Sequence, residues 1–198
     1  MTEAQPIRLG LLQYPVGRPA SIADFAARLD RWLEEGRASA DLLVLPEYAA
    51  VELGAALNGG EASEAAELSA MITAAPAILE VMRDAARRHQ VWLQPGTLPM
   101  RAADGHVVNR APLITPEGRI AFQEKRAMTR FETERWGISQ GIDPNVFDTP
   151  WGRIGISICY DIEFPKHARV QVMAGAWLIL APSCTDTLAG FNRVHFSA

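Results

Sequence analysis

Short apolar runs that alternate with longer amphipathic stretches constrain the fold of this chain most strongly. The run Asp41–Leu45 is apolar after its first residue and ends at Pro46, which is typical of a strand buried on both faces. The run Ile154–Ile158 has a similar character. Before the first run, large apolar side chains at helical spacing predict an amphipathic helix that begins at Ser21: Ile22, Phe25, Leu29, Trp32 and Leu33. Strands that alternate with helices predict an α/β fold.

The remaining elements continue this alternation and predict a single domain over residues 1–198 with a mixed sheet. Two of the strands flank the turn Thr115–Gly118, so we expect these two to pair antiparallel. No internal repeat or long linker divides the chain. The further predicted strands are Ile7–Gln13, Val91–Gln94, Val107–Thr115, Arg119–Gln123 and Trp177–Ala181. The further predicted helices are Glu64–Thr73, Pro76–His89, Glu163–Gly175 and one that begins at Asp186.

The composition is ordinary for a globular protein and argues against several kinds of partner. Hydrophobic residues make up 48% and charged residues 21% of the 198 residues, and the net charge is −4. The net charge therefore gives no electrostatic reason to expect nucleic acid or an anionic membrane as a binding partner. No apolar run approaches the roughly 20 residues of a membrane span. The N-terminus lacks a basic stretch followed by an apolar one, so we expect no signal peptide and a cytoplasmic protein.

The cysteines and histidines predict neither a disulfide framework nor a metal site. The two cysteines, Cys159 and Cys184, are expected to be reduced thiols. None of the four histidines lies at zinc-finger or metalloprotease spacing from another ligand, so we expect no bound metal.

Cys159 stands where an apolar strand gives way to polar and aromatic residues. Pro165, which can open a helix, follows shortly after it. This pattern presents a thiol at the end of a strand, where a helix N-terminus or a nearby cation can stabilise the thiolate. A half-buried structural cysteine is the alternative interpretation, because free cysteines are often buried.

Two further ionisable residues occupy predicted strand ends. Glu47 follows the run Asp41–Leu45, and Lys125 follows the strand Arg119–Gln123. Ligand sites of α/β sheets gather at the carboxyl ends of strands. Together with Cys159, a carboxylate at Glu47 and an ammonium at Lys125 suit acyl transfer. The carboxylate can take the thiol proton. The ammonium can lower the thiol pKa and stabilise an oxyanion. The backbone N–H of Tyr160 is a second candidate oxyanion donor. Alone, Glu47 could be a cap and Lys125 a solvated edge charge.

Three segments in this order resemble the carbon–nitrogen hydrolase (nitrilase) superfamily: Leu43–Glu47, Glu124–Lys125 and Ile158–Asp161. Two further segments match the family: Thr129–Glu132 together with Glu134 and Trp136, and Ala181–Ser183. The resemblance runs from about Ile7 to Ala198. The sequence Cys-Tyr-Asp looks like the amidase and carbamoylase-like branches of the family.

The resemblance implies a four-layer αββα sandwich and a Glu-Lys-Cys triad. Carried over, Glu47 is the general base and acid, Lys125 the oxyanion stabiliser and Cys159 the nucleophile. The second glutamate that many members have is assigned to Glu134, with Glu132 as its rival. No metal or organic cofactor is implied, and a homodimer or higher homo-oligomer is expected. Family members normally continue past the position of Ala198, so the sandwich is expected to be truncated.

The predicted function is the hydrolysis of a small linear amide through a cysteine thioester. An N-carbamoyl amine hydrolase of the same family and a catalytically inactive binding protein stay open as alternatives. Many relatives carry an arginine where Glu163 stands and a glutamate where Lys166 stands, which leaves the substrate open. A papain-type pairing of Cys159 with His167 has little support. Cys184 could be a second nucleophile, but it is expected to line the pocket wall or to pack in the core.

Overall fold

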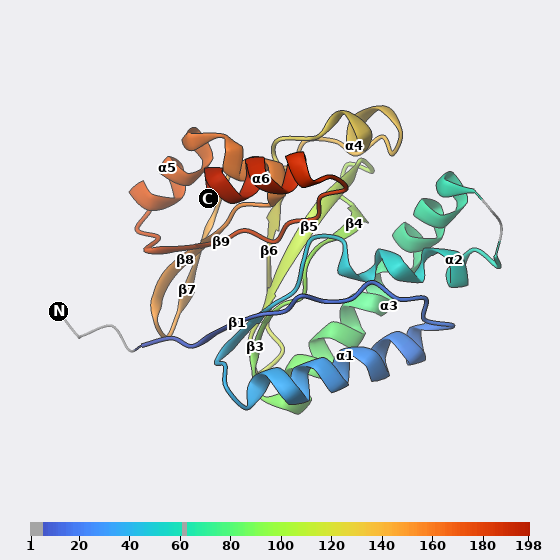
Figure 1. Cartoon of the computed structure of the whole chain (residues 1–198), viewed down its shortest axis with the longest axis horizontal. Helices are drawn as coiled ribbons and strands as arrows, with labels where there is room; N and C mark the ends of the chain where they lie inside the picture. Colours follow the sequence, from blue (N-terminus) through green and yellow to red (C-terminus); the bar gives the residue numbers. More distant parts are fainter. Residues whose placement is uncertain (1–5, 61–62) are drawn as a thin grey trace.

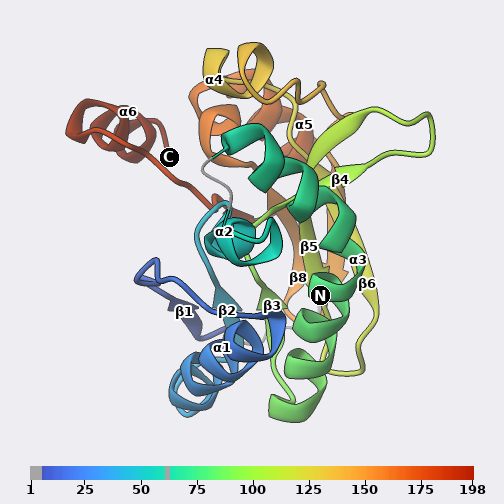
Figure 2. The same ribbon diagram turned by 90° about the vertical axis from the view of Figure 1, so that its right-hand side faces the viewer.

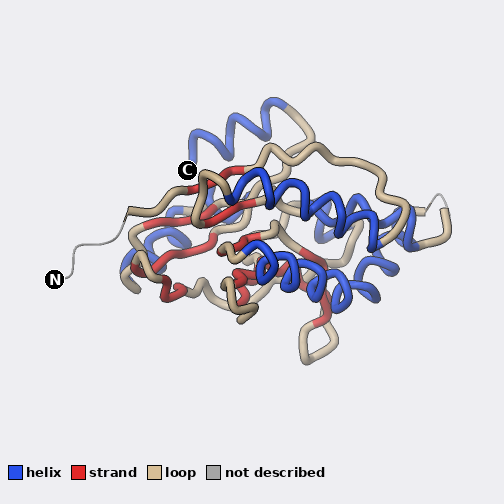
Figure 3. Tube along the Cα trace, turned by 90° about the horizontal axis from the view of Figure 1, so that it is seen from below, coloured by secondary structure: helices blue, strands red, loops and turns tan. Residues whose placement is uncertain are grey.

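The computed structural model describes residues 6–60 and 63–198 and has two β-sheets packed face to face, with helices on the outer faces (Figure 1). Helices α1 (Ile22–Arg37) and α3 (Glu64–His89) cover one sheet, and α5 (Pro165–Met173) covers the other. Seen from below, α1 and α3 are two long neighbouring helices in front of the strands (Figure 3). The expected αββα sandwich is confirmed. Residues 1–5, part of the segment that argued against a signal peptide, lie outside the described residues.

The first sheet is mixed, as the sequence predicted. Its strands lie in the order β1-β2-β3-β5-β4, and β6 pairs with β5. The first three are parallel and the others join antiparallel. Strand β4 was not predicted; it contains Pro99 and lies at the sheet edge, where a residue without an N–H is tolerated. The strands are β1 (Leu9–Leu11), β2 (Leu42–Val44), β3 (Trp92–Gln94), β4 (Leu98–Arg101), β5 (Val107–Ile114) and β6 (Ile120–Glu124).

The second sheet has three described strands: β7 (Val146–Thr149), β8 (Gly152–Ile156) and β9 (Leu178–Leu180). The unpredicted strand β7 forms a hairpin with β8, whereas β8 and β9 are parallel and joined through α5. On α5, the Gln171 amide donates to the carbonyl oxygens of Ile156 (2.8 Å) and Asn145 (3.1 Å). A Cβ atom at Gly155 would lie 2.7 Å from this amide, so glycine permits the close approach of α5 to β8.

Strand β2 explains why its apolar run shows no alternation. Leu43 and Leu45 face the core that α1 and α3 cover, whereas Leu42 and Val44 face the second sheet. Both faces of the strand are therefore buried, as expected for a central parallel strand.

Helix α1 begins as the sequence predicted. The hydroxyl of Ser21 accepts a hydrogen bond from the N–H of Asp24 (3.2 Å), and Asp24 in turn accepts one from the N–H of Ala20 (3.0 Å). The buried face of the helix contains Phe25, Leu29 and Leu33. The shorter helices are η1 (Ala49–Leu53), α2 (Gly54–Leu57), α4 (Arg130–Glu134), η2 (Cys159–Glu163) and α6 (Leu188–Ser197). Figure 2 shows α6 projecting away from the sheets.

The prediction of two helices on either side of residues 74 and 75 was wrong, since α3 is one continuous helix of 26 residues. Pro76 lies inside it on the exposed face and lacks the N–H that would bond to Ile72. The helix continues because Met71, Ala75 and Ile78 form one buried stripe against the core. Among the described helices, α3 alone has the length and composition to cross a membrane, but this stripe packs it as the core helix of a globular domain.

Candidate active site

Three buried ionisable side chains meet at one end of the interface between the two sheets. Glu47 follows β2, Lys125 directly follows β6, and Cys159 follows β8. Strands β2 and β6 point the same way, because two antiparallel steps separate the parallel pair β2-β3 from β6. The ammonium of Lys125 lies 2.8 Å from Glu47 Oε1, and both residues are almost fully buried. The sequence therefore identified three groups that the fold brings together.

The second glutamate at the site is Glu132, and the choice of Glu134 is corrected. Lys125 Nζ lies 2.9 and 2.8 Å from the two carboxylate oxygens of buried Glu132. Glu134 is exposed and pairs with Arg130 at 2.8 Å. The sequence did contain a signal for the right residue. Thr129 and Glu132 form a capping box that turns the Glu132 carboxylate back over the helix start, whereas Glu134 lies outside this motif.

Two neutral residues that the sequence analysis missed complete the hydrogen bonding. The Asn109 amide on β5 donates to Oε1 of Glu47 (3.0 Å) and of Glu132 (3.3 Å). The Tyr48 hydroxyl donates to Glu132 Oε1 (2.7 Å). Buried carboxylates need such donors, since an unpaired buried charge is very costly. Neither Asn109 nor Tyr48 belongs to a pattern that singles it out, so only spatial proximity reveals them.

The charge balance of the cluster centres on Lys125. Burial opposes the charged form of Lys125, but Glu47 and Glu132 outweigh it and raise the Lys125 pKa. Burial likewise pushes the Glu132 pKa upward, but Lys125 and the hydrogen bonds from Thr129 and Tyr48 lower it overall. For Glu47, burial prevails and raises the pKa, with a further upward contribution from the charge of Glu132. Glu132 is thus the fixed anion of the pair, and Glu47 binds a proton more readily.

Cys159 adopts a backbone conformation that few non-glycine residues take. Its φ is +48°, in the left-handed region, and its N–H donates to the carbonyl oxygen of Pro182 (3.0 Å). The thiol Sγ lies 3.5 Å from the carbonyl oxygen of Cys184. Such a turn at the end of β8 aims the side chain out of the strand, and the thiol lies close enough to Glu47 for the carboxylate to affect its pKa.

The expectation that Lys125 lowers the Cys159 pKa is only partly met. Burial, followed by the negative charge of Glu47, raises the pKa of the thiol to about 12, although Lys125 pulls in the other direction. At neutral pH the resting side chain is therefore a neutral thiol. Chemistry at this sulfur requires its proton to leave during the reaction, and the neighbouring Glu47 can accept it.

Asp161 links the segments that carry Lys125 and Cys159. Its carboxylate accepts hydrogen bonds from the N–H groups of Ala127 (2.6 Å), Arg126 (3.1 Å) and Ile158 (3.2 Å). His167 lies 3.6 Å from the same carboxylate, so its ring is paired with Asp161 as a structural partner. This arrangement removes the support for a papain-type pair, because the His167 imidazole has another partner.

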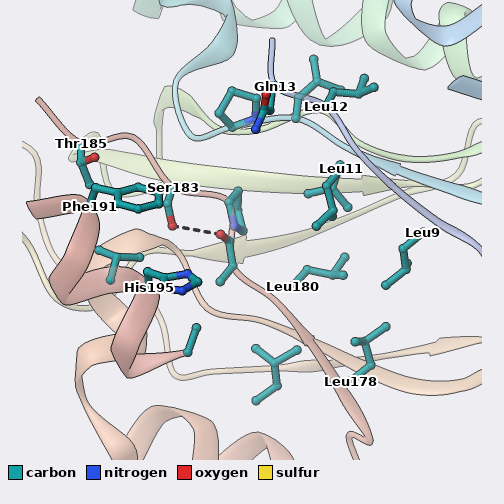
Figure 4. Close-up of a pocket in the computed structure, with 18 residues that line it drawn as sticks. Leu9, Leu11, Leu12, Gln13, Leu178, Leu180, Ser183, Thr185, Phe191 and His195 are labelled. Carbon is teal, nitrogen blue, oxygen red and sulfur yellow. Dashed lines mark hydrogen bonds between the residues drawn. The ribbon is translucent and has the colours of Figure 1, made fainter. Parts of the chain in front are cut away.

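The structure also has an apolar groove of about 610 Å³ (Figure 4). Its walls come from β1, β2, β9 and α6, and they include Leu11, Leu180 and the stacked pair Phe191 and His195. The wall residues Pro46 and Ser183 are next in sequence to Glu47 and Cys184, but the three clustered ionisable groups do not line the groove. Within residues 6–60 and 63–198, no group of three histidine, cysteine or acidic side chains could hold a metal ion.

Lys125→Met is expected to lower the free energy of unfolding by about 3–5 kcal/mol, because two buried carboxylates lose their shared cation. Urea denaturation followed by circular dichroism measures this change. The control is Glu134→Gln, which breaks an exposed pair and should leave the midpoint unchanged. Equal stability of the Lys125 variant and the wild type would contradict this charge balance.

Comparisons with known proteins agree with the fold and the motifs. The family model described as "Carbon-nitrogen hydrolase" matches residues 8–196. A Bacillus subtilis protein named "Probable hydrolase YhcX" is 32% identical over 194 residues, which cover 98% of this chain and 37% of that protein. A "Deaminated glutathione amidase" of Yersinia enterocolitica is 27% identical over 178 residues, which cover 84% of this chain and 59% of that protein.

The solved structures include a carbon-nitrogen hydrolase from Helicobacter pylori G27 with a TM-score of 0.75 and 22% identity. The match covers 96% of this chain and 66% of that one, so the chain spans about two thirds of that structure and less of the curated relatives. The sandwich, the match to the family model over most of the chain and the similar proteins lead to one conclusion: the chain belongs to the carbon–nitrogen hydrolase family.

Proposed function

We propose that the protein hydrolyses the C–N bond of a small linear carboxamide, with Cys159 as nucleophile and Glu47, Lys125 and Glu132 as its partners. The observation that carries the proposal is the buried ammonium of Lys125, held between two carboxylates where the thiol of Cys159 emerges. A charged cluster of this kind is costly to bury, so its presence beside a thiol favours a chemical role.

In the first step, Cys159 Sγ attacks the carbonyl carbon of the amide while its proton moves to Glu47. The raised pKa of Glu47 suits it to hold that proton, and the thiol pKa of about 12 explains why a base must take it. The oxyanion that forms is stabilised by the ammonium of Lys125 and the N–H of Tyr160. Tyr160 lies in the first turn of η2, where helical N–H groups lack an intrahelical partner.

In the second step, Glu47 returns the proton to the leaving nitrogen, and ammonia departs from a Cys159 thioester. Water then attacks the thioester carbonyl while Glu47 takes its proton. The carbon–sulfur bond breaks, the proton returns to the sulfur, and a carboxylic acid leaves. In the net reaction one amide and one water become one acid and one ammonia, and no step of this scheme uses a metal or an organic cofactor.

Glu132 is a positioning residue in this scheme. Its lowered pKa keeps it ionised, and its two oxygens hold Lys125 Nζ at 2.8 and 2.9 Å. The Lys125 ammonium is thereby kept charged and directed at the site of the oxyanion. The intact cluster argues against the alternative of a catalytically inactive binding protein.

The amide class receives support from the Yersinia relative named "Deaminated glutathione amidase". An N-carbamoyl amine would undergo the same attack at a carbonyl carbon, and no contact among the described residues favours it over a carboxamide. A cytoplasmic location and self-association stay predictions from the sequence and the family resemblance.

Cys159→Ala is expected to reduce the hydrolysis of amides to background, whereas Cys184→Ala retains activity. The measurement is release of ammonia or amine from a panel of linear amides, carbamoyl amines and nitriles. Loss of the nucleophile removes the thioester route entirely. Turnover that survives in Cys159→Ala would exclude the mechanism, and no turnover of the wild type across the panel would favour the inactive binding protein.

The pH dependence of kcat/KM is expected to show an acid limb set by Glu47. Protonated Glu47 cannot take the thiol proton, so the rate rises as pH passes the raised Glu47 pKa, above the ordinary value of about 4.3. Because the charge of Glu132 contributes to that rise, Glu132→Gln should move the limb to lower pH and reduce kcat. Glu134→Gln is the matched control and should change neither. An unchanged limb in Glu132→Gln would contradict the assignment.

A further inference from the structure

The second cysteine of the chain lies directly beside the first. Cys159 Sγ is 3.5 Å from the carbonyl oxygen of Cys184, and Cys159 N–H bonds to the carbonyl oxygen of Pro182 at 3.0 Å. The segment that carries Cys184 therefore contacts Cys159 at two points, the carbonyl oxygens of Pro182 and Cys184. Both cysteines are free thiols. The sequence alone allows Cys184 to be a second nucleophile, a residue of the pocket wall or a core residue.

The two thiols differ in their access to solvent. Cys159 is buried, whereas Cys184 is exposed. Burial, and then the charge of Glu47, raise the pKa of Cys184 while Lys125 opposes them, so its sulfur lies in the field of the same cluster. At neutral pH Cys184 carries a proton, which makes it a weak nucleophile toward amides.

We infer that Cys184 is a resolving thiol, which forms a reversible disulfide with Cys159 after a peroxide has oxidised Cys159. The inference rests on the proposed function, because it requires Glu47 to take the proton of Cys159 when the thiol attacks. A peroxide is as small as a linear amide, so a site that admits such an amide also admits hydrogen peroxide.

Two balanced steps lead to the disulfide. First, Cys159 Sγ attacks one oxygen of hydrogen peroxide, the O–O bond breaks, and the thiol becomes a sulfenic acid. The proton taken by Glu47 goes to the departing hydroxide, which leaves as water. Second, Cys184 Sγ attacks the sulfur of Cys159, the S–O bond breaks, and the hydroxide leaves as water with the Cys184 proton. Two thiols are oxidised and one peroxide is reduced to two waters.

The contact of the Cys159 thiol with the backbone of Cys184 makes the two residues neighbours in space. A disulfide requires Cα atoms roughly 4.4–6.8 Å apart, and the segment that carries Cys184 has to adjust to meet this requirement. The segment from Ala181 to Thr187 contains no helix or strand, so it can adjust to the bond. The disulfide would block the nucleophile and protect it from the irreversible sulfinic and sulfonic acids.

The test exposes the reduced protein to a small excess of hydrogen peroxide and then to dithiothreitol. Ammonia release from an amide and the intact and peptide masses are followed at each stage. The wild type should lose activity, lose the mass of two hydrogen atoms and yield a peptide that links Cys159 to Cys184. Dithiothreitol should restore both the activity and the mass.

Cys184→Ala is the critical variant. It should start with wild-type activity, gain two or three oxygen atoms on Cys159 and stay inactive after dithiothreitol. Cys159→Ala should form no intramolecular link. Full recovery of Cys184→Ala, or a peroxide-treated wild type without the linked peptide, would overturn the inference while the proposed function stands. Failure of the untreated, reduced wild type to hydrolyse any amide would instead overturn the proposed function.

Discussion

The ammonium of Lys125, buried between Glu47 and Glu132, is the interaction on which the rest of the site depends. Three charged groups out of water are stable only when each has partners at good geometry. Those partners come from separate elements, with Asn109 on β5 and Tyr48 next to Glu47. The cluster therefore holds the loops after β2 and β6 and the start of α4 in one arrangement.

The sandwich brings Cys159, the proposed nucleophile, to this cluster from the other sheet. Burial and the nearby carboxylate raise the pKa of the Cys159 thiol to about 12, so the proposed mechanism requires Glu47 to take the thiol proton as the sulfur attacks the substrate. Asp161 connects the two sheets at this point, since its carboxylate accepts hydrogen bonds from backbone N–H groups of both the segment after Lys125 and the segment before Cys159. The same proximity places Cys184 beside Cys159.

Much of the fold could be predicted because strands buried on both faces, such as β2, have a continuous apolar sequence. The wrong or missing predictions of single elements and residues have local causes. Strand β4 is short and contains a proline, and Pro76 does not end α3 because a buried stripe on either side of it holds the helix together. Glu134 was preferred over Glu132 on its distance to Cys159 along the chain, although the capping box at Thr129 marks Glu132.

By itself, the sequence determined the class of fold, the family resemblance and three ionisable residues at strand ends, because short motifs and hydrophobic periodicity are local properties. The tertiary structure alone decided which neutral residues donate to the carboxylates and how far burial raises the pKa of Cys159. These are properties of distance and desolvation, and both arise only when segments far apart in the chain pack together.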